Sequence, residues 1–404
     1  MRHWPVDRPG VDPSVRIHCE ELKLAPDVII GAGTVLVGDR IEIAEGTVIG
    51  PGCDVRASQV RIGPGSEFDR DVRVLVAERF EVGAAARMAR GARITCRSFT
   101  AGNLLYFGDE SVVGYGGTTT STAHVSVGSR VTIGQHSILN ANLPITIGDN
   151  VGTGSYLSIW THGYHFGHGP LDGFETAYAP VTVEDNVWLG FQITILPGVS
   201  VGRNTMVAAG AVVSRSLPEN VMAAGVPAKV KKTIAARQLT PGDAVKALTA
   251  VVDKWAEELR WKGHQVSHRG EDGIWTARLS PAGTASSEEL SVSVRSRHQP
   301  APAMGGASHH AVIFVDGLPD GFERDHPDVS YFDVRGGGMG GPRTGLSEDL
   351  RNELRRHAMP CGERHTFTSI KPEPFGRLSR VGITGELSDG ARREAGADVV
   401  DGAH

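Results

Sequence analysis

The sequence of 404 residues predicts a mainly β protein, in which a long parallel β-solenoid is followed by a small α+β domain. Three observations support this prediction: a six-residue repeat, aliphatic-glycine pairs that recur about every 20 residues, and a change of composition after Lys232. A period of six fits neither an amphipathic helix nor an alternating strand. Repetition at a fixed short period is typical of stacked coils.

The repeat is clearest in six consecutive hexads that run from Val183 to Pro218. Each hexad begins with a branched aliphatic residue, such as Leu189 or Ile195, and its second residue is often small. We expect the first residue of each hexad to point inward and to form aliphatic ladders between coils. Small residues allow sharp corners between the faces of a coil.

The same opening extends far upstream as an aliphatic residue followed by glycine. Examples begin at Ile62, Val82, Phe107, Val127 and Ile147, and most of these are 20 residues apart. That spacing corresponds to three hexads plus about two corner residues. We therefore predict about nine coils between Asp27 and Pro218, with residues 1–26 as an N-terminal lead-in and the solenoid domain spanning 27–237.

The repeat breaks between Ile159 and Val181. Residues 160–180 contain no hexad and are rich in glycine, histidine and aromatic residues. Long loops on a rigid scaffold usually carry function, so this segment is the predicted catalytic loop. Its three histidines, His162, His165 and His168, also raise the alternative of a metal site.

Composition limits the class of protein. The formal net charge of -5 gives no reason to expect nucleic acid binding. Four scattered cysteines favour reduced thiols, and neither an apolar leader nor a membrane span is evident. We expect a cytoplasmic protein without a membrane partner.

The C-terminal part predicts a second domain at 238–370. Thr240 and Pro241 suit the start of a helix that ends near Gly263. Its expected apolar stripe consists of Val245, Leu248, Val252, Trp255 and Leu259. Four strands and a second helix from Ser347 follow, the strands being predicted at Ile274–Leu279, Leu290–Val294, Ala311–Val315 and Ser330–Val334. The polar tail, residues 371–404, is expected to be disordered.

The hexad order resembles that of the hexapeptide-repeat acyltransferases, most closely the galactoside and maltose acetyltransferase group. Two motifs carry the resemblance: Asp185-Asn-Val-Trp-Leu-Gly190 and Ala224-Gly-Val-Pro-Ala228. The resemblance covers about Asp27 to Lys232. It implies a left-handed parallel β-helix of triangular section, a homotrimer, and an active site at each interface between subunits.

The resemblance places the catalytic base on His162, because imidazole has a pKa suited to removing a proton near neutral pH. His165 is the alternative if the loop alignment shifts by three residues. Asn140, in the stretch Asn140-Ala-Asn-Leu143, would hydrogen-bond the acceptor. Asparagine at a solenoid corner is equally an ordinary turn former.

The resemblance also implies an acyl-CoA site. Ala209 and Ser214 would line the pantetheine groove through backbone atoms, and the phosphates would be held by basic side chains. Gly190 would offer its backbone N–H to the thioester oxygen. Phe191 occupies a position where the family usually has a small residue, and it would reshape the acyl channel. Trp188 would either line the site or pack between coils. The predicted phosphate-binding residues are Arg215, Lys229 and Lys232.

Together these features predict a CoA-dependent O- or N-acyltransferase, with acetyl-CoA as co-substrate and no required metal. The acceptor would be a hydroxyl or amine of a sugar, a glycan precursor or a small metabolite. Two alternatives stay open at this point. One is a non-catalytic β-solenoid scaffold, and the other is a metal hydratase that resembles the γ-class carbonic anhydrases.

Overall fold

The computed structural model describes residues 2–4, 8–115, 120–163, 167–234, 237–269, 274–279, 288–299, 307–359 and 361–362. The chain divides into two compact units, Met1–Ala236 and Arg237–His404. Each unit has its own hydrophobic core. Within the described part of the chain, no helix combines the length and apolar character needed to cross a membrane.

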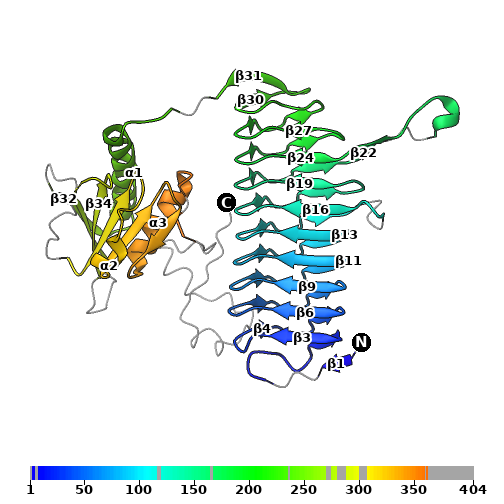
Figure 1. Cartoon of the computed structure of the whole chain (residues 1–404), viewed down its shortest axis with the longest axis horizontal. Coiled ribbons are helices and arrows are strands. Elements are labelled where there is room, and N and C mark those ends of the chain that lie inside the picture. The colour runs from blue at the N-terminus through cyan, green and yellow to red at the C-terminus, as the bar shows by residue number, and fades with distance from the viewer. Residues whose placement is uncertain are drawn as a thin grey trace. The chain divides into compact units, whose positions relative to one another are not determined.

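The first unit is a parallel β-solenoid, seen in Figure 1 as a regular stack of short strands. Trp188 pairs with Met206 and Thr194 pairs with Val212, so each strand lies beside the strand three hexads later. One coil therefore consists of three hexads and has three faces. An eighteen-stranded sheet forms two of these faces and an eleven-stranded sheet forms the third.

The strands of the two solenoid sheets are short. The eighteen-stranded sheet contains β1 (Arg2–Trp4), β2 (Arg16–Cys19), β3 (Glu21–Leu24), β5 (Val35–Val37), β6 (Arg40–Ile43), β8 (Asp54–Arg56), β9 (Gln59–Ile62), β11 (Arg73–Val82), β13 (Arg93–Ala101), β15 (Val112–Val113), β16 (His124–Val127), β18 (Ile138–Asn140), β19 (Ile145–Ile147), β21 (Ser158–Trp160), β24 (Val181–Val183), β26 (Thr194–Ile195), β27 (Ser200–Val201) and β29 (Val212–Val213). The eleven-stranded sheet contains β4 (Ile29–Ile30), β7 (Val48–Ile49), β10 (Glu67–Phe68), β12 (Arg87–Met88), β14 (Tyr106–Phe107), β17 (Thr132–Ile133), β20 (Gly152–Thr153), β25 (Trp188–Leu189), β28 (Met206–Val207), β30 (Val221–Ala224) and β31 (Lys229–Thr233).

The core of the solenoid is a set of columns that run along the stack. The first residue of every hexad from Val183 to Pro218 is buried, which confirms the predicted inward orientation, and the fifth residue is buried as well. Burial of a large aliphatic side chain contributes about 1.5–3 kcal/mol, and every coil repeats that contribution. In the N-terminal half a phenylalanine ladder takes over part of the core, through Phe68, Phe80, Phe99 and Phe107.

An asparagine ladder runs along one corner of the stack. The Asn150 Nδ2 donates to Asn186 Oδ1, Asn186 Nδ2 donates to Asn204 Oδ1, and Asn204 Nδ2 donates to Asn220 Oδ1. All four residues have a positive φ, between 56° and 59°. Asparagine tolerates this left-handed conformation better than most residues, which explains its recurrence at this corner.

The solenoid begins earlier than the sequence predicted. Strands β2 and β3 pair in parallel with β5 and β6, and Val11 already forms a bridge with Ile30. Ile17 and Cys19 are fully buried in the same core. Residues 1–26 are therefore not merely a lead-in. These residues contain no aliphatic-glycine pair, and that pair is the feature by which the sequence indicates the other coils.

The four cysteines are all buried and free, which confirms the prediction of unpaired thiols. Burial raises the pKa of Cys53 and of Cys96 to about 12. Both thiols therefore stay protonated near neutral pH and serve as small core residues rather than as nucleophiles.

The second unit contains a mixed sheet with two helices, α1 and α3, packed on one face. Strands β34, β35 and β36 are parallel to one another, and the remaining pairs are antiparallel. The sheet order follows the sequence: β32 (Gln265–Arg269), β33 (Ile274–Leu279), β34 (Glu288–Arg295), β35 (His309–Phe314), β36 (Val329–Asp333) and β37 (Gly338–Gly340). The helices are α1 (Pro241–Trp261), α2 (Phe322–Asp325) and α3 (Gly345–Arg356).

Helix α1 follows the prediction closely. Thr240 caps its start by accepting a hydrogen bond from the backbone N–H of Asp243. The predicted stripe is buried at Leu248, Val252, Trp255 and Leu259. Helix α3 begins two residues before the predicted Ser347, because Thr344 rather than a later residue provides the N-cap. The predicted tail, 371–404, lies outside the described residues.

Candidate active site

A hairpin arm interrupts the solenoid between β21 and β24. Its two strands, β22 (His162–Gly163) and β23 (Ala177–Tyr178), pair antiparallel, and a short 3-10 helix (Pro170–Asp172) follows β22. We call residues 162–178 the arm. Figure 1 shows it leaving the stack beside β24. The coils on either side stay in register, since Ile145 pairs with Val181 and Ser158 pairs with Thr194.

The base of the arm is fixed by Thr161. Its buried hydroxyl donates to the Asn140 carbonyl at 2.8 Å and accepts from the backbone N–H groups of Asn142 at 2.8 Å and Leu143 at 3.1 Å. The carbonyl of Thr161 accepts from the N–H of Ala179 at 3.1 Å, which closes the neck. The residue before His162 therefore has almost no freedom.

His162 lies at the base of the arm, in register with Tyr178. The two rings stack, with centroids 6.0 Å apart and planes 22° from parallel. Trp160, the last residue of β21, contributes a second aromatic contact at 6.2 Å. These contacts hold a half-buried imidazole between two rings on a rigid support. The sequence identifies the histidine but not its partner Tyr178, because the strand pairing of a hairpin cannot be predicted from an irregular loop sequence.

The other arm histidines occupy different places. His165 lies outside the described residues. His168 lies near the 3-10 helix, with its Nδ1 3.8 Å from the Asp172 carboxylate and its ring 5.4 Å from that of Phe174. Across the residues that the structure describes, no three metal-binding side chains come together.

Asn140 is not placed to contact an acceptor. Its side chain is fully buried, and its Nδ2 donates to the Tyr115 carbonyl at 2.6 Å. The prediction of a direct acceptor contact is therefore wrong for this residue. Asn142, in the same stretch, is 8% exposed. The Oδ1 atoms of both asparagines are buried and have no hydrogen-bond partner among the described residues, so Asn142 is no more accessible to an acceptor through this atom than Asn140.

Gly190 is not placed to bind an oxyanion. Its N–H already donates to the Val207 carbonyl at 2.8 Å, as part of the ladder between coils. A Cβ atom at this position would lie 2.7 Å from the backbone nitrogen of Ala209. The glycine is therefore needed for close approach of two coils, and the predicted oxyanion role is wrong.

Four further predicted site residues fall at two corners that bound one face, the face formed by β18, β21, β26 and β29. The arm corner contains residues 140–143, 161, 196–198 and 214–216, so it includes Ser214 and Arg215, which are both exposed. The aromatic corner contains residues 135–136, 155–156, 191–192 and 209–210, so it includes Phe191 and the exposed Ala209. Within one chain the structure does not bring these two sets together.

The aromatic corner has a row of exposed rings that the sequence did not reveal. His136 stacks on Tyr156 with centroids 5.2 Å apart, and Tyr156 meets Phe191 edge-on at 5.6 Å. Phe191 is 51% exposed and Tyr156 is 47% exposed. The arm insertion separates Tyr156 from Phe191 in sequence, which hides their common position in successive coils.

Trp188 and the predicted lysines belong to the eleven-stranded sheet that adjoins the aromatic corner. Trp188 is 48% exposed, and its ring lies over Gly152 of the neighbouring strand, so it is not packed between coils. Lys229 and Lys232 lie on β31, which is exposed throughout and pairs antiparallel with β30 at the end of this sheet. A basic strand therefore flanks an exposed apolar corner.

Comparison with known proteins agrees with this architecture. Residues 180–215 match the family described as bacterial transferase hexapeptide (six repeats). A putative acetyltransferase of Saccharomyces cerevisiae is 43% identical over 120 residues, which is 28% of this chain and 61% of that protein. The galactoside O-acetyltransferase of Escherichia coli is 37% identical over 117 residues, 28% of this chain and 58% of that protein. The chain thus spans about three-fifths of the length of these curated relatives.

A solved galactoside acetyltransferase in complex with coenzyme A is 28% identical, with a TM-score of 0.27 over 34% of this chain and 66% of that chain. Hexapeptide repeats fit a left-handed β-helix, and the mainly β solenoid predicted from the sequence is confirmed. The chain carries the hexapeptide repeat of the bacterial transferases and is similar to acetyltransferases of that kind.

Proposed function

We propose that this protein is an acyl-CoA-dependent acyltransferase that moves an acetyl group to a hydroxyl or amine of a sugar or small metabolite. The observation that carries the proposal is its similarity to acetyltransferases, which include a galactoside O-acetyltransferase. The arm supports it, because it presents an imidazole at the surface of the coil that the repeat builds.

In the proposed reaction His162 acts as the general base. Its imidazole takes the proton from the acceptor hydroxyl or amine as that atom attacks the thioester carbonyl of acetyl-CoA. A C–O or C–N bond forms, the C–S bond breaks, and CoA leaves as the thiol once the proton returns to sulfur. Such a base contributes about 10²–10⁴ in rate, provided that it is held in position. The stacking on Tyr178 and the bonds of Thr161 supply that position.

We also infer that a complete site needs two copies of the chain. The arm corner carries the base, whereas the aromatic corner and the basic strand β31 suit acyl-CoA, and one solenoid face separates them. A homotrimer would place the arm corner of one subunit against the aromatic corner of the next. Closed cyclic symmetry would then give three equivalent sites. Exposed Arg215, Lys229 and Lys232 would bind the CoA phosphates.

The test is acceptor-dependent release of CoA thiol from acetyl-CoA, screened over sugars and small amines, beside thermal stabilisation by CoA alone. A transferase should show both responses, since a ligand at 100 times its Kd stabilises by about 2.7 kcal/mol. If millimolar CoA left the melting temperature unchanged and no acceptor released thiol, a non-catalytic scaffold would replace the proposal. Light scattering measures the oligomeric state and so tests whether two chains share a site. A monomer that is active at all concentrations would exclude the shared site.

A further inference from the structure

A groove of about 660 Å³ lies on the solenoid face that follows the arm corner, in the coils before the arm. Ligand sites are commonly clefts of about 300–1,000 Å³. The edge of the groove nearest the corner is lined by Ser58, Gln59, Glu78, Arg79, Ser98 and His124. These side chains come from β9, β11, β13 and β16, which pair in register, and from the residue before β9. The groove therefore runs along the stack, across successive coils.

The two acidic and basic side chains that line the groove already have partners. Glu78 accepts a hydrogen bond from Arg97 Nη2 at 2.5 Å, and Arg79 Nε lies 3.7 Å from Glu81 Oε1. The charges of the groove are thus balanced within the chain. Its other lining groups are hydroxyls, one amide and one imidazole, which both donate and accept hydrogen bonds. A neutral ligand rich in hydroxyl groups fits this lining.

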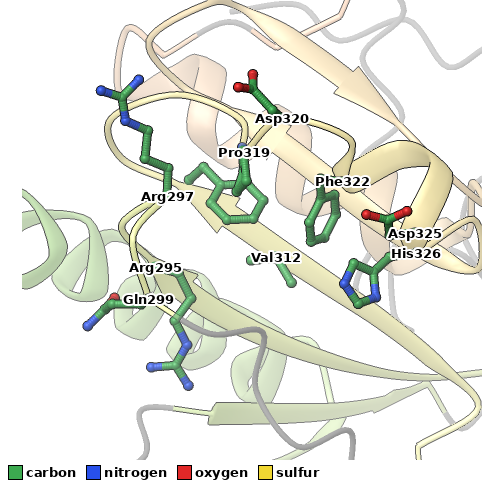
Figure 2. Close-up of a pocket in the computed structure, with 10 residues that line it drawn as sticks. Arg295, Arg297, Gln299, Val312, Pro319, Asp320, Phe322, Asp325 and His326 are labelled. Atoms are coloured by element: carbon green, nitrogen blue, oxygen red, sulfur yellow. The ribbon is translucent and has the colours of Figure 1, made fainter.

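The hydroxyl-rich lining is a particular feature of this groove. The second unit contains a smaller cavity of about 170 Å³, where Arg295 and Arg297 are matched by Asp320 and Asp325 (Figure 2). Its charges are balanced too, but none of the residues that line it carries a hydroxyl group. In the groove, half of the lining residues are serine or threonine.

The donors and acceptors of the groove are held in place by His124. Its Nε2 lies 3.1 Å from the Ser121 carbonyl and its Nδ1 lies 2.6 Å from Ser98 Oγ. A carbonyl oxygen can only accept, so Nε2 carries the hydrogen, and Nδ1 of the neutral ring accepts from the Ser98 hydroxyl. The lone pairs of Ser98 Oγ then serve as acceptors for a donor on the ligand.

A column of hydroxyl side chains leads from the groove to the arm. Thr100 and Ser126 line the groove, and Ser126 is in register with Thr146 of β19, which is in register with Thr182 of β24. Ser126 and Thr146 are exposed, and Thr182 is half-buried. Because β24 is the strand that follows the arm, the column ends beside the segment that carries His162.

An exposed aromatic ring lies at the same corner. Tyr115, on the segment between β15 and β16, is 61% exposed, and its carbonyl accepts from Asn140 Nδ2. Asn140 in turn accepts from Thr161 at the base of the arm. The tyrosine combines an apolar ring with a polar tip, which suits the faces and edges of a sugar.

We propose that the groove and the hydroxyl column bind the distal sugars of a neutral, extended oligosaccharide whose reacting end lies at His162. This inference rests on the proposed acetyl transfer and names the class of its acceptor. Paired strands lie about 4.8 Å apart, so the hydroxyls recur along a straight line. A β-linked hexose chain is straight and carries hydroxyls along both edges, whereas an α-linked chain coils. One water occupies about 30 Å³, so the groove has room for more than one sugar ring.

The experiment uses the full chain and titration calorimetry, without acetyl-CoA, with cellobiose, cellotetraose and maltotetraose. We expect cellotetraose to bind at least tenfold more tightly than cellobiose, because its additional rings reach the groove. Maltotetraose, which is α-linked, should bind no better than cellobiose. With acetyl-CoA present, kcat/KM for release of CoA thiol should likewise be about tenfold higher with cellotetraose than with cellobiose.

Ser126→Trp tests the path of the chain, because an indole at this exposed position would cover the column. The Kd for cellotetraose should rise about tenfold, to the value for cellobiose. Lys23→Trp is the matched control, since Lys23 is an exposed residue of β3 on the same face, outside the groove. It should bind cellotetraose as the unaltered chain does. Circular dichroism and melting establish that each variant is folded.

The outcomes separate this proposal from the proposed transfer. Equal Kd values for cellobiose and cellotetraose would overturn the groove, as would maltotetraose binding as tightly as cellotetraose. Equal weakening in Lys23→Trp and Ser126→Trp would overturn it too. Transfer to cellobiose without any gain from chain length would contradict the groove and leave the proposed transfer intact. Tight binding of cellotetraose without acceptor-dependent release of thiol would support the groove and contradict the transfer.

Discussion

The arm corner and the aromatic corner of the solenoid are built from the same hexad but use it differently. At the arm corner the side-chain hydroxyl of Thr161 makes hydrogen bonds that backbone groups make elsewhere in the stack. The chain leaves the coil at this point to form the arm. At the aromatic corner the backbone ladder is unbroken, and exposed rings of successive coils stack on one another.

The comparison shows how a repeat can accommodate an inserted segment without losing the pairing of its strands. Strand pairing across the insertion is unchanged, so the arm disturbs the regular backbone hydrogen bonding at a single corner only. The uninterrupted corner can then serve as a rigid binding surface. Each of the following predictions alters one corner, or the strand β31 that adjoins the aromatic corner, and leaves the other corner intact.

The largest effect is expected for His162→Ala. Turnover should fall by about 10²–10⁴, while the Kd for CoA stays the same, because the proposed base acts on the acceptor. Steady-state kinetics and calorimetry measure the two quantities. His168→Ala, elsewhere on the arm, is the control and should retain the unaltered rate. Equal loss in both variants would assign the arm a structural function only.

Thr161→Val should affect stability as well as rate. The change leaves the backbone N–H groups of Asn142 and Leu143 without their buried partner, at a cost of about 1–3 kcal/mol for each unsatisfied group, whereas the Asn140 carbonyl keeps the N–H of Thr161. The free energy of unfolding, measured by urea denaturation, should decrease, and turnover should fall because His162 is displaced. Thr161→Ser keeps the hydroxyl and should restore both. A stable and active Thr161→Val variant would contradict this account of the arm base.

Lys229→Ala should raise the apparent KM for acetyl-CoA about two- to fivefold with little change in kcat. An exposed ion pair contributes about 0.2–1 kcal/mol, and contacts to phosphate are alike in the ground and transition states. Lys254→Ala, on α1 of the second unit, is the control for loss of one positive charge. Unchanged KM values at low salt would remove β31 from the proposed CoA site.

The smallest effect is expected for Phe191→Ala. Because the ring is half exposed, its removal should change kcat/KM for acetyl-CoA by about twofold or less, while activity with propionyl-CoA relative to acetyl-CoA rises about threefold. Competition between the two thioesters, followed by mass spectrometry, gives the ratio. A ratio unaltered by the substitution would show that Phe191 does not limit the acyl group.

Much of the fold was predictable from the sequence because it repeats. Buried columns at the first and fifth hexad positions, and the stripe of α1 with its Thr240 cap, follow from periodicity and local capping. Strands β32 and β37 were missed, since the sequence of β32 has no clear alternation of apolar and polar residues and β37 lies within a glycine-rich run.

The site was less predictable because its geometry is set by contacts that periodicity does not encode. The burial of Asn140 depends on Tyr115, which is distant in sequence, and the engagement of the Gly190 N–H depends on the next coil. Resemblance to a family selected Asn140 and Gly190 by residue type and position in the motif. It could not show whether a side chain faces the core or the solvent, or whether a backbone donor was already used.

The asparagine ladder has a consequence for how such a protein can change in length. Each amide donates to the next asparagine in the same direction, from Asn150 to Asn220, so every member requires a neighbour one full coil away. Deleting a few residues within a coil would misalign a donor and an acceptor, whereas deleting a complete coil would let the flanking asparagines rejoin. Evolution can therefore shorten or extend this stack most readily in whole-coil steps, while an insertion such as the arm is tolerated only where the ladder does not pass.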